Sequence, residues 1–300
     1  MKKRFLKFMS TILIAAMIVA GYTGVADNQG VFAAEKSVKI YATISDENGE
    51  IAVKQKSVMV TDVDEDGAFT IYDALYCTHE KYYKGGAEAG FAAENSDWGL
   101  SLTKLWGAEN GGSYGYYLND QYVMTGLSEP VKEGDFVSAF VYTDLTTWSD
   151  AFTYFNKRVY GLNKGKSLKL ELSYYALDYT TYDLTATPLS NARILVNGEP
   201  TEAITNANGV TYINFEKSGS YFISATHPGM TIVAPSAVVF VKPQIGEVIK
   251  VDGLKYTVTK KGSVSGKKGK VTISKASAGS KKIPSKIDYA GIVFKVKVVD

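Results

Sequence analysis

The sequence contains very little cysteine, histidine and proline. Cys77 is the one cysteine, so no disulfide can form within the chain, and stability must come from packed cores or a bound metal. His79 and His227 are the two histidines, too few for a zinc site without cysteine pairs. The composition therefore argues against a disulfide scaffold and against a zinc enzyme.

Motifs for catalysis and nucleotide binding are missing as well. The sequence has no phosphate-binding loop and no dinucleotide fingerprint, and residues 262–266 have Val264 where a nucleophile elbow needs serine. No segment suggests the paired carboxylates of a glycoside hydrolase. We therefore expect a protein that is not an enzyme and that has no nucleic-acid partner.

One long apolar run is present, residues 9–20, and it follows a basic N-terminus. Residues 31–34 then match the cleavage pattern of a secretory signal, so we predict a signal peptide over residues 1–33, cleaved after Ala33. A membrane anchor is the alternative, but a spanning helix needs about 20 apolar residues and this run is shorter. Because no second such run follows, we expect no transmembrane segment in the mature chain, and a secreted protein at the extracellular cell surface.

Charge is unevenly distributed. Residues 35–243 hold 16 basic and 26 acidic side chains, a balance of −10, whereas residues 244–300 hold 13 lysines and 4 acids, a balance of +9. Such a bipolar chain indicates two different partners or two different tasks. The basic segment fits contact with an anionic cell-wall polymer, and equally a solvated surface whose lysines protect sheet edges.

Apolar patterning divides the mature chain into three parts, mainly of β structure. Residues 35–156 predict a hairpin over 37–61, a helix over 71–83 with Asp73 facing away from its apolar side, and strands over 98–106, 114–118, 122–124 and 136–142. This order describes an α+β module of β-grasp type.

The remaining residues predict β structure without helices. A linker is expected over 157–166, and residues 160–243 carry short strands separated by Asn-Gly turns, which is typical of an Ig-like β-sandwich. Residues 244–300 predict a short, Lys-rich segment of three or four strands.

The segment 62–73 carries the strongest signal for a binding site. As a 12-position calcium loop it has carboxylates at positions 1, 3, 5 and 12, and glycine at position 6, where the sharp turn needs it. Calcium suits this set because it takes several hard oxygen ligands in flexible geometry. The predicted ligands are Asp62, Asp64, Asp66, the carbonyl of Ala68, Thr70 directly or through water, and Asp73.

The same segment also has an explanation without metal. Thr70 and Asp73 have the spacing of a capping box at the start of a helix, and Asp/Gly-rich turns between a strand and a helix are common. However, the alternating Asp62, Asp64 and Asp66 repel one another unless a cation lies among them. Calcium is therefore our preferred interpretation.

Three stretches of the first module resemble a known family. They are residues 60–83, the run GLSLTKLWG at 99–107, and YGYYLN at 114–119 followed by VKEGDFV at 131–137. Together they resemble a bacterial secreted domain of unknown function related to the C-terminal β-grasp domain of transcobalamin, over about residues 37–156. The resemblance implies a ligand-binding or adhesive module, with corrinoid contact as a more distant implication.

The other parts resemble segments of bacterial surface proteins. Residues 190–192, 197–198, 205–209 and 218–221 are similar to Ig-like domains of such proteins. Residues 251–258, with 283–284 and 294–296, are similar to the β-rich stretches that border leucine-rich repeats.

Aromatic residues of the first module offer a second candidate site. A sugar-stacking face is predicted from Trp98, Trp106, Tyr116, Tyr117 and Trp148. Core and edge packing explains aromatic residues of a β domain equally well. The two interpretations remain open at this point.

These features predict a secreted or cell-surface binding or adhesion protein. It would have a calcium-stabilised β-grasp module, an Ig-like spacer and a basic tail, with a cell-wall polymer or surface glycan as partner. The alternative is an extracellular protein that binds a small ligand, a corrinoid or a glycan, and an enzyme is the third hypothesis.

Overall fold

The hairpin predicted over residues 37–61 is present and forms two strands of the first sheet. We describe a computed structural model that covers residues 37–97, 99–177, 183–279 and 281–300, all within the compact unit Lys36–Asp300. The predicted signal peptide, residues 1–33, lies outside these ranges. Five strands form the sheet: β1 (Val38–Ser45), β2 (Ile51–Val60), β5 (Tyr114–Leu118), β6 (Gln121–Tyr122) and β7 (Phe136–Val141).

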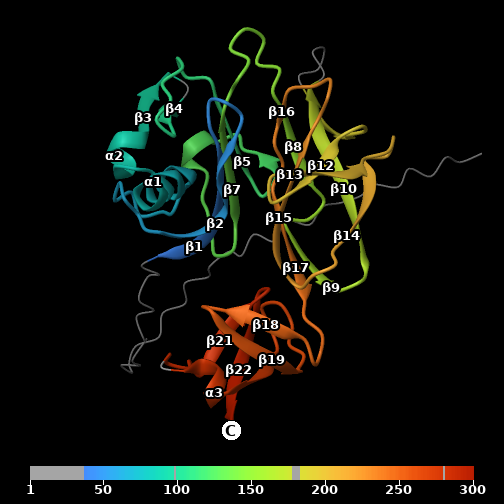
Figure 1. The fold of residues 1–300 in the computed structure, drawn as a ribbon. Helices are drawn as coiled ribbons and strands as arrows, with labels where there is room; N and C mark the ends of the chain where they lie inside the picture. Colours follow the sequence, from blue (N-terminus) through green and yellow to red (C-terminus); the bar gives the residue numbers. More distant parts are fainter. Residues whose placement is uncertain (1–36, 98, 178–182, 280) are drawn as a thin grey trace, which may run out of the picture. The chain divides into compact units, whose positions relative to one another are not determined.

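The order of this sheet is β2-β1-β7-β5-β6, with β1 and β7 parallel at its centre (Figure 1). Alternation along β1 buries Val38, Ile40, Ala42 and Ile44, as the sequence predicts. A hairpin, one covering helix and a central parallel pair agree with the predicted β-grasp type. The prediction that the chain is mainly β is confirmed for the described residues, which form several sheets and few helices.

The helix α1 (Ile71–Tyr82) packs its apolar side on this sheet. Ile71, Ala74, Leu75 and Thr78 are buried at helical spacing. The prediction that Asp73 faces away was wrong: its side chain is fully buried, because it caps the helix start.

Three short elements follow α1 that the sequence did not predict, namely α2 (Gly86–Gly90), β3 (Phe91–Ser96) and the 3-10 helix η1 (Gly126–Ser128). The strand predicted over 98–106 is β4 (Gly99–Leu105), which pairs with β3 in a separate two-stranded sheet.

Two further sheets share one core in the second part of the chain. In one, β10 pairs with β8, β11 and β14, and β8 also pairs with β16. Its strands are β8 (Ala151–Phe155), β10 (Ser167–Leu177), β11 (Leu184–Pro188), β14 (Val210–Asn214) and β16 (Ile232–Val233). The strand β8, which lies inside the predicted first module, thus pairs in this sheet.

The facing sheet has the order β13-β12-β15-β17-β9. Its strands are β9 (Val159–Asn163), β12 (Arg193–Val196), β13 (Glu199–Ile204), β15 (Gly219–Thr226) and β17 (Ala237–Lys242). Leu170 from one sheet and Ile223 and Val239 from the other are fully buried in the shared core, as expected for a β-sandwich. The linker predicted over 157–166 was wrong in part, because β9 runs through it and pairs in parallel with β17.

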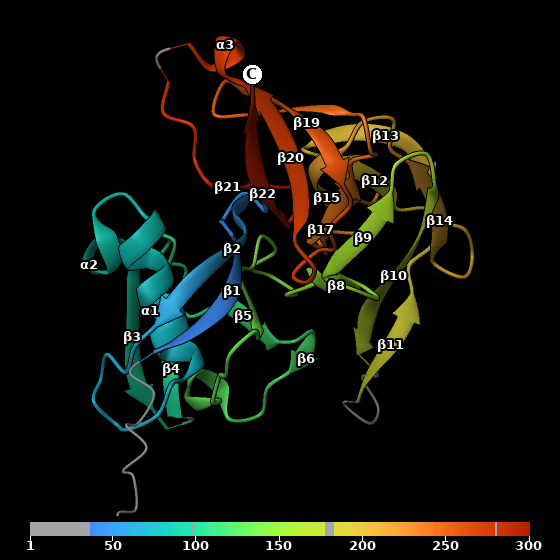
Figure 2. The same ribbon diagram turned by 90° about the horizontal axis from the view of Figure 1, so that it is seen from below.

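The last sheet has the order β18-β19-β20-β22-β21 and its own core around Tyr256 and Phe294. Figure 2 shows β19, β20 and β22 side by side. Its elements are β18 (Val248–Val251), β19 (Leu254–Lys260), β20 (Gly269–Ser274), α3 (Lys275–Ala278), β21 (Lys286–Tyr289) and β22 (Ile292–Val299). No helix in the described part of the chain is long and apolar enough to cross a membrane.

A polar and aromatic joint connects the first sheet with the sandwich. Tyr117 of β5 stacks on Phe152 of β8, with ring centroids 3.6 Å apart and planes at 5°. Arg158 forms an ion pair with Asp120, both largely buried, through its Nη2 and through an Nε–Oδ2 hydrogen bond of 3.0 Å. The carbonyl of Arg158 accepts a hydrogen bond of 3.0 Å from Gln55.

Candidate metal centre

The loop between β2 and α1 is fixed at its far end by backbone hydrogen bonds. Val131 donates to the carbonyl of Phe69 at 2.7 Å, and Ile71 donates to the carbonyl of Glu129 at 2.9 Å. Thr70 is the N-cap of α1 and pairs with Pro130 in an isolated bridge. The loop therefore connects β2 to the N-terminus of α1, which these contacts fix in place.

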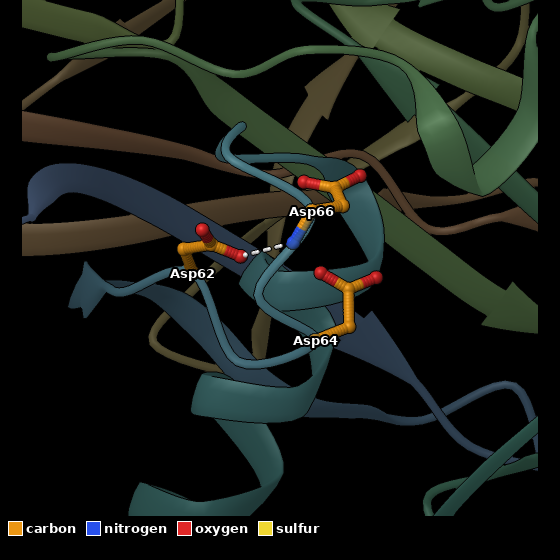
Figure 3. A group of neighbouring side chains, drawn as sticks. All are labelled: Asp62, Asp64 and Asp66. Carbon is orange, nitrogen blue, oxygen red and sulfur yellow. Dashed lines mark hydrogen bonds between the residues drawn. The ribbon is translucent and has the colours of Figure 1, made fainter.

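Within this loop, Asp62, Asp64 and Asp66 lie close together (Figure 3). Each offers a carboxylate oxygen, and these oxygens lie within 4.8 Å of one another. Asp62 is half-buried, whereas Asp64 and Asp66 are exposed. The structure thus brings together three of the predicted ligands, those of positions 1, 3 and 5.

Hydrogen bonds within the loop orient two of these carboxylates. Asp62 accepts from the backbone nitrogens of Asp66 at 3.1 Å and Gly67 at 2.9 Å, one bond to each oxygen. Asp66 accepts from the nitrogen of Ala68 at 2.8 Å. A carboxylate oxygen has two lone pairs, so each of these oxygens retains one for a cation.

Asp73 is used differently. Its Oδ1 accepts from the nitrogen of Val63 at 2.7 Å, and its Oδ2 accepts from the nitrogen and the hydroxyl of Thr70 at 2.9 and 2.8 Å. With the bond from the Asp73 nitrogen to Thr70 Oγ1, these contacts complete the capping box. Asp73 is not part of the three-carboxylate group, and the hydroxyl of Thr70 is engaged in the cap.

The backbone of the loop requires its glycine. Gly67 has φ +88°, in the left-handed region, while no atom lies near the position of an added Cβ. Glycine is thus favoured at position 6 by backbone conformation and not by lack of space. This is the sharp turn that the calcium-loop pattern predicts.

Electrostatics in the loop disfavour a full set of negative charges. Loss of hydration, then the charges of Asp73 and Asp66, raise the pKa of Asp64 above its ordinary value. Burial and the charge of Asp64 raise the pKa of the nearby Tyr72. A cation among the carboxylates would relieve this repulsion.

Three of the predicted ligands, Asp62, Asp64 and Asp66, are placed so that they could bind a hard divalent cation together, whereas Asp73 lies outside this group. The three carboxylates have the spacing required to hold the cation, and Asp73 has a lone pair left on Oδ1 beside its bond to Val63. The chemistry of oxygen donors favours calcium over a softer metal.

The residues predicted as an aromatic ligand face do not share one face. Tyr116 and Tyr117 are neighbours on β5, so they point to opposite sides: Tyr116 packs against the first core, and Tyr117 is buried at the joint. Trp106 packs at the rim of the first core, with its ring 4.9 Å from that of Tyr83. Trp148 is exposed and donates to Ser113, and Trp98 lies outside the described residues.

The sequence analysis assigned no structural role to His79, which contacts Trp106. His79 is fully buried, and burial lowers its pKa to about 4. Its Nε2 accepts from the backbone nitrogen of Trp106 at 3.0 Å, so the ring proton is on Nδ1, which donates to the carbonyl of Leu75 at 2.7 Å. The sequence signal that could have indicated this burial is the position of His79 four residues after Leu75, on the same side of the helix.

The chain was compared with protein families, curated proteins and solved structures. No known protein family and no curated protein match the chain. Five solved chains match in structure, among them the D0-D1 domain of Intimin, with a TM-score of 0.24 and 10% sequence identity over 67% of this chain and 97% of that one. A likeness of this size does not identify a shared fold, and the resemblance to the transcobalamin domain stays a prediction.

Proposed function

We propose that the chain is a non-catalytic binding or adhesion protein of the cell surface, whose first module is stabilised by calcium. The observation that carries the calcium part is the approach of Asp62, Asp64 and Asp66 to within 4.8 Å in the loop before α1. A secretory signal predicted over residues 1–33 and a chain built mainly of β-sheets support the surface role.

Calcium would act on the loop and on the helix that follows it. Three carboxylates meet in the loop, and Asp73 adds a fourth charge nearby, whereas the start of α1 offers only a partial positive charge in return. A bound divalent cation would offset that repulsion and tie the loop to the cap. The folded protein binds such an ion far better than the unfolded chain, so calcium raises the free energy of unfolding.

The test is thermal unfolding of the chain without residues 1–33, in chelator and in millimolar calcium. At a hundredfold excess over the dissociation constant the gain is about 2.7 kcal/mol. For a chain of this size that corresponds to a rise in Tm of roughly 5–10 °C, if the first module and the sandwich unfold together. Magnesium should have little effect, because it prefers rigid octahedral sites and gives up its water reluctantly.

Two variants separate the metal site from the cap. Asp64→Asn should abolish the calcium response and leave the stability in chelator unchanged or higher, because it removes one of the repelling charges. Asp73→Asn should lower stability both in chelator and in calcium, because it weakens the capping box. Asp288→Asn, an exposed aspartate of β21, is the matched control and should keep the full calcium response.

A metal-free loop gives a different result. If calorimetry detects no calcium binding to the wild-type chain and Tm is the same in chelator and in calcium, the loop is only a cap and a turn. The calcium part of the proposal is then wrong, while a surface-binding role stays open to the next test.

The binding role itself is tested with ligands. We propose a cell-wall polymer or surface glycan as partner, since a bipolar charge distribution and exposed side chains such as Trp148 suit contact with a polar surface. A panel of glycans, wall polymers and corrinoids, read by calorimetry, distinguishes the alternatives. A corrinoid ligand would also be seen as visible absorbance that co-purifies with the protein.

A further inference from the structure

A pocket of about 520 Å³ lies where the sandwich meets the C-terminal sheet, and four lysines line it. They are Lys164, Lys166, Lys242 and Lys261. Three belong to the sandwich and one to the C-terminal sheet, so neither part of the chain makes the pocket alone.

Sheet topology brings the sandwich lysines together. The strands β9 and β17 are parallel neighbours, and Asn163 at the end of one pairs with Lys242 at the end of the other. Because parallel strands end at the same edge of a sheet, the turn after β9 reaches the end of β17. That turn carries Lys164 and Lys166 and is closed by a 3.1 Å hydrogen bond from the nitrogen of Lys166 to the carbonyl of Asn163.

Polar contacts hold the C-terminal sheet beside these lysines. Glu247 pairs with Lys164 at 3.3 Å, accepts from the nitrogen of Gln244 at 3.1 Å and accepts from the hydroxyl of Ser218. Tyr289 donates to the carbonyl of Ser218 at 2.8 Å. Lys261 follows the last residue of β19 and completes the rim.

The charge of the pocket is largely uncompensated. Among the ion pairs of the described residues, Lys164 has a carboxylate partner, and Lys166, Lys242 and Lys261 have none. Several ammonium groups around one pocket repel one another and attract anions. The lysines therefore favour a ligand with more than one negative charge.

The pocket also has an apolar part. Pro243 and Ile292, both buried, line it, and Ile245 is 60% exposed beside the lysines. An exposed isoleucine next to ammonium groups suits a ligand that has a carbon body as well as charge. Inorganic phosphate alone would leave this part unused.

We propose that this pocket binds a phosphorylated polyol or sugar, either as a small phosphate ester or as the repeating unit of an anionic polymer. A phosphate monoester carries close to two charges with three acceptor oxygens, and a polymer brings one charge for each unit, so both can meet several lysines at once. The proposal deepens the surface-binding role and rests on it for its setting, but it does not depend on calcium.

The experiment compares two triple variants of the chain without residues 1–33, both with the same loss of charge. The pocket variant is K166Q/K242Q/K261Q, which keeps the Lys164–Glu247 pair. The control variant is K286Q/K295Q/K297Q, with exposed lysines of β21 and β22 that do not line the pocket. Binding is measured by calorimetry at low salt with glycerol 3-phosphate, a poly(glycerol phosphate) oligomer, uncharged glycerol, hyaluronate and a DNA duplex.

The pocket variant should bind the phosphate probe about tenfold or more weakly than the wild type, since each exposed charge contact contributes a factor of roughly 2 to 5 at low salt. The control variant should stay within about twofold, and glycerol should not bind. Binding of glycerol 3-phosphate indicates a small ester as ligand, and binding of the oligomer alone indicates a polymer.

Three results would overturn the proposal. They are no binding of either phosphate probe by the wild type, an equal loss in the two triple variants, and equally tight binding of hyaluronate or DNA. Circular dichroism checks that the variants are folded, and if the pocket variant is not, K261Q against K268Q repeats the comparison with one charge. Loss of the calcium response with phosphate binding intact, or the reverse, tells this proposal apart from the calcium site.

Discussion

Lowering the pH should destabilise the first module through His79. Its side chain is fully buried, and its pKa is about 4 in the folded chain against 6.5 in an unfolded one. Protonation therefore favours unfolding: the contribution of the neutral ring is fully present above pH 6.5 and is lost as the pH falls toward 4. A difference of about 2.5 pKa units corresponds to about 3 kcal/mol.

The hydrogen bonds of the ring explain why the charged form is disfavoured. Nε2 accepts from the nitrogen of Trp106 at 3.0 Å, so a second ring proton would face a donor instead of an acceptor. The ring also packs against Phe91 and Trp106, with centroids 5.3 Å apart in both pairs. Protonation would thus place an uncompensated charge among aromatic rings.

The assay is urea unfolding at pH 7, 5.5 and 4.5, combined with an NMR titration of the two histidines. Carboxylates also titrate in this range, so the quantity compared is the pH dependence of wild type minus that of His79→Gln, with His227→Gln as control. Between pH 7 and 4.5 the wild type should lose about 2–2.5 kcal/mol more than His79→Gln, since pH 4.5 still lies above the pKa of about 4 in the folded chain. If wild type and His79→Gln have the same pH dependence, or if His79 titrates near 6.5, the reasoning is refuted.

Three further predictions concern stability, each measured as the free energy of unfolding in urea. Thr70→Ala removes the N-cap and should cost about 1–2 kcal/mol; an unchanged value would mean that the capping box is dispensable. Arg158→Met leaves the largely buried Asp120 unpaired and should cost about 3–5 kcal/mol, and a loss below about 1 kcal/mol would contradict this. Gly209→Ala should cost more than Gly198→Ala, since a Cβ at 209 would lie 2.3 Å from the carbonyl of Leu172 whereas 198 is open, and equal losses would show that φ alone decides.

Strands and their partners were predictable where the pattern is local. Alternation along β1 and the Asn-Gly turn at 48–49 indicate the hairpin, and helical spacing indicates α1. Short or exposed elements such as α2 and β21 carry too few periodic residues to stand out. Parallel pairs such as β9 with β17 join distant segments, and periodicity does not say which strands become neighbours.

The candidate metal centre could be predicted in composition but not in the role of each ligand. The alternation of Asp62, Asp64 and Asp66 indicates that their carboxylates share one side of a turn, which agrees with their approach. The role of Asp73 depends on the helix start, where its oxygens accept bonds from Thr70 and Val63. Spacing alone fits both a twelfth ligand and a capping box, and hydrogen bonds decide which contacts the side chain makes.

The joint at Arg158 shows why the linker expected over residues 157–166 was wrong in part. Two adjacent basic residues followed by Gly161 and Lys164 have the composition of a solvated connection. The partners that make Arg158 structural, Asp120 and Ser236, are far away in sequence, so no local pattern reveals them.

This joint also bears on the calcium response. The Arg158–Asp120 pair and the stack of Tyr117 on Phe152 couple the first sheet to the sandwich, because separating the two would expose an aromatic pair and leave a charge without its partner. Stabilisation that calcium provides in the loop before α1 should therefore delay unfolding of the sandwich as well. The calcium response is therefore best measured on the chain without residues 1–33, because a fragment that ends before β8 would lack Phe152 and Arg158 and would leave Tyr117 and Asp120 exposed to solvent.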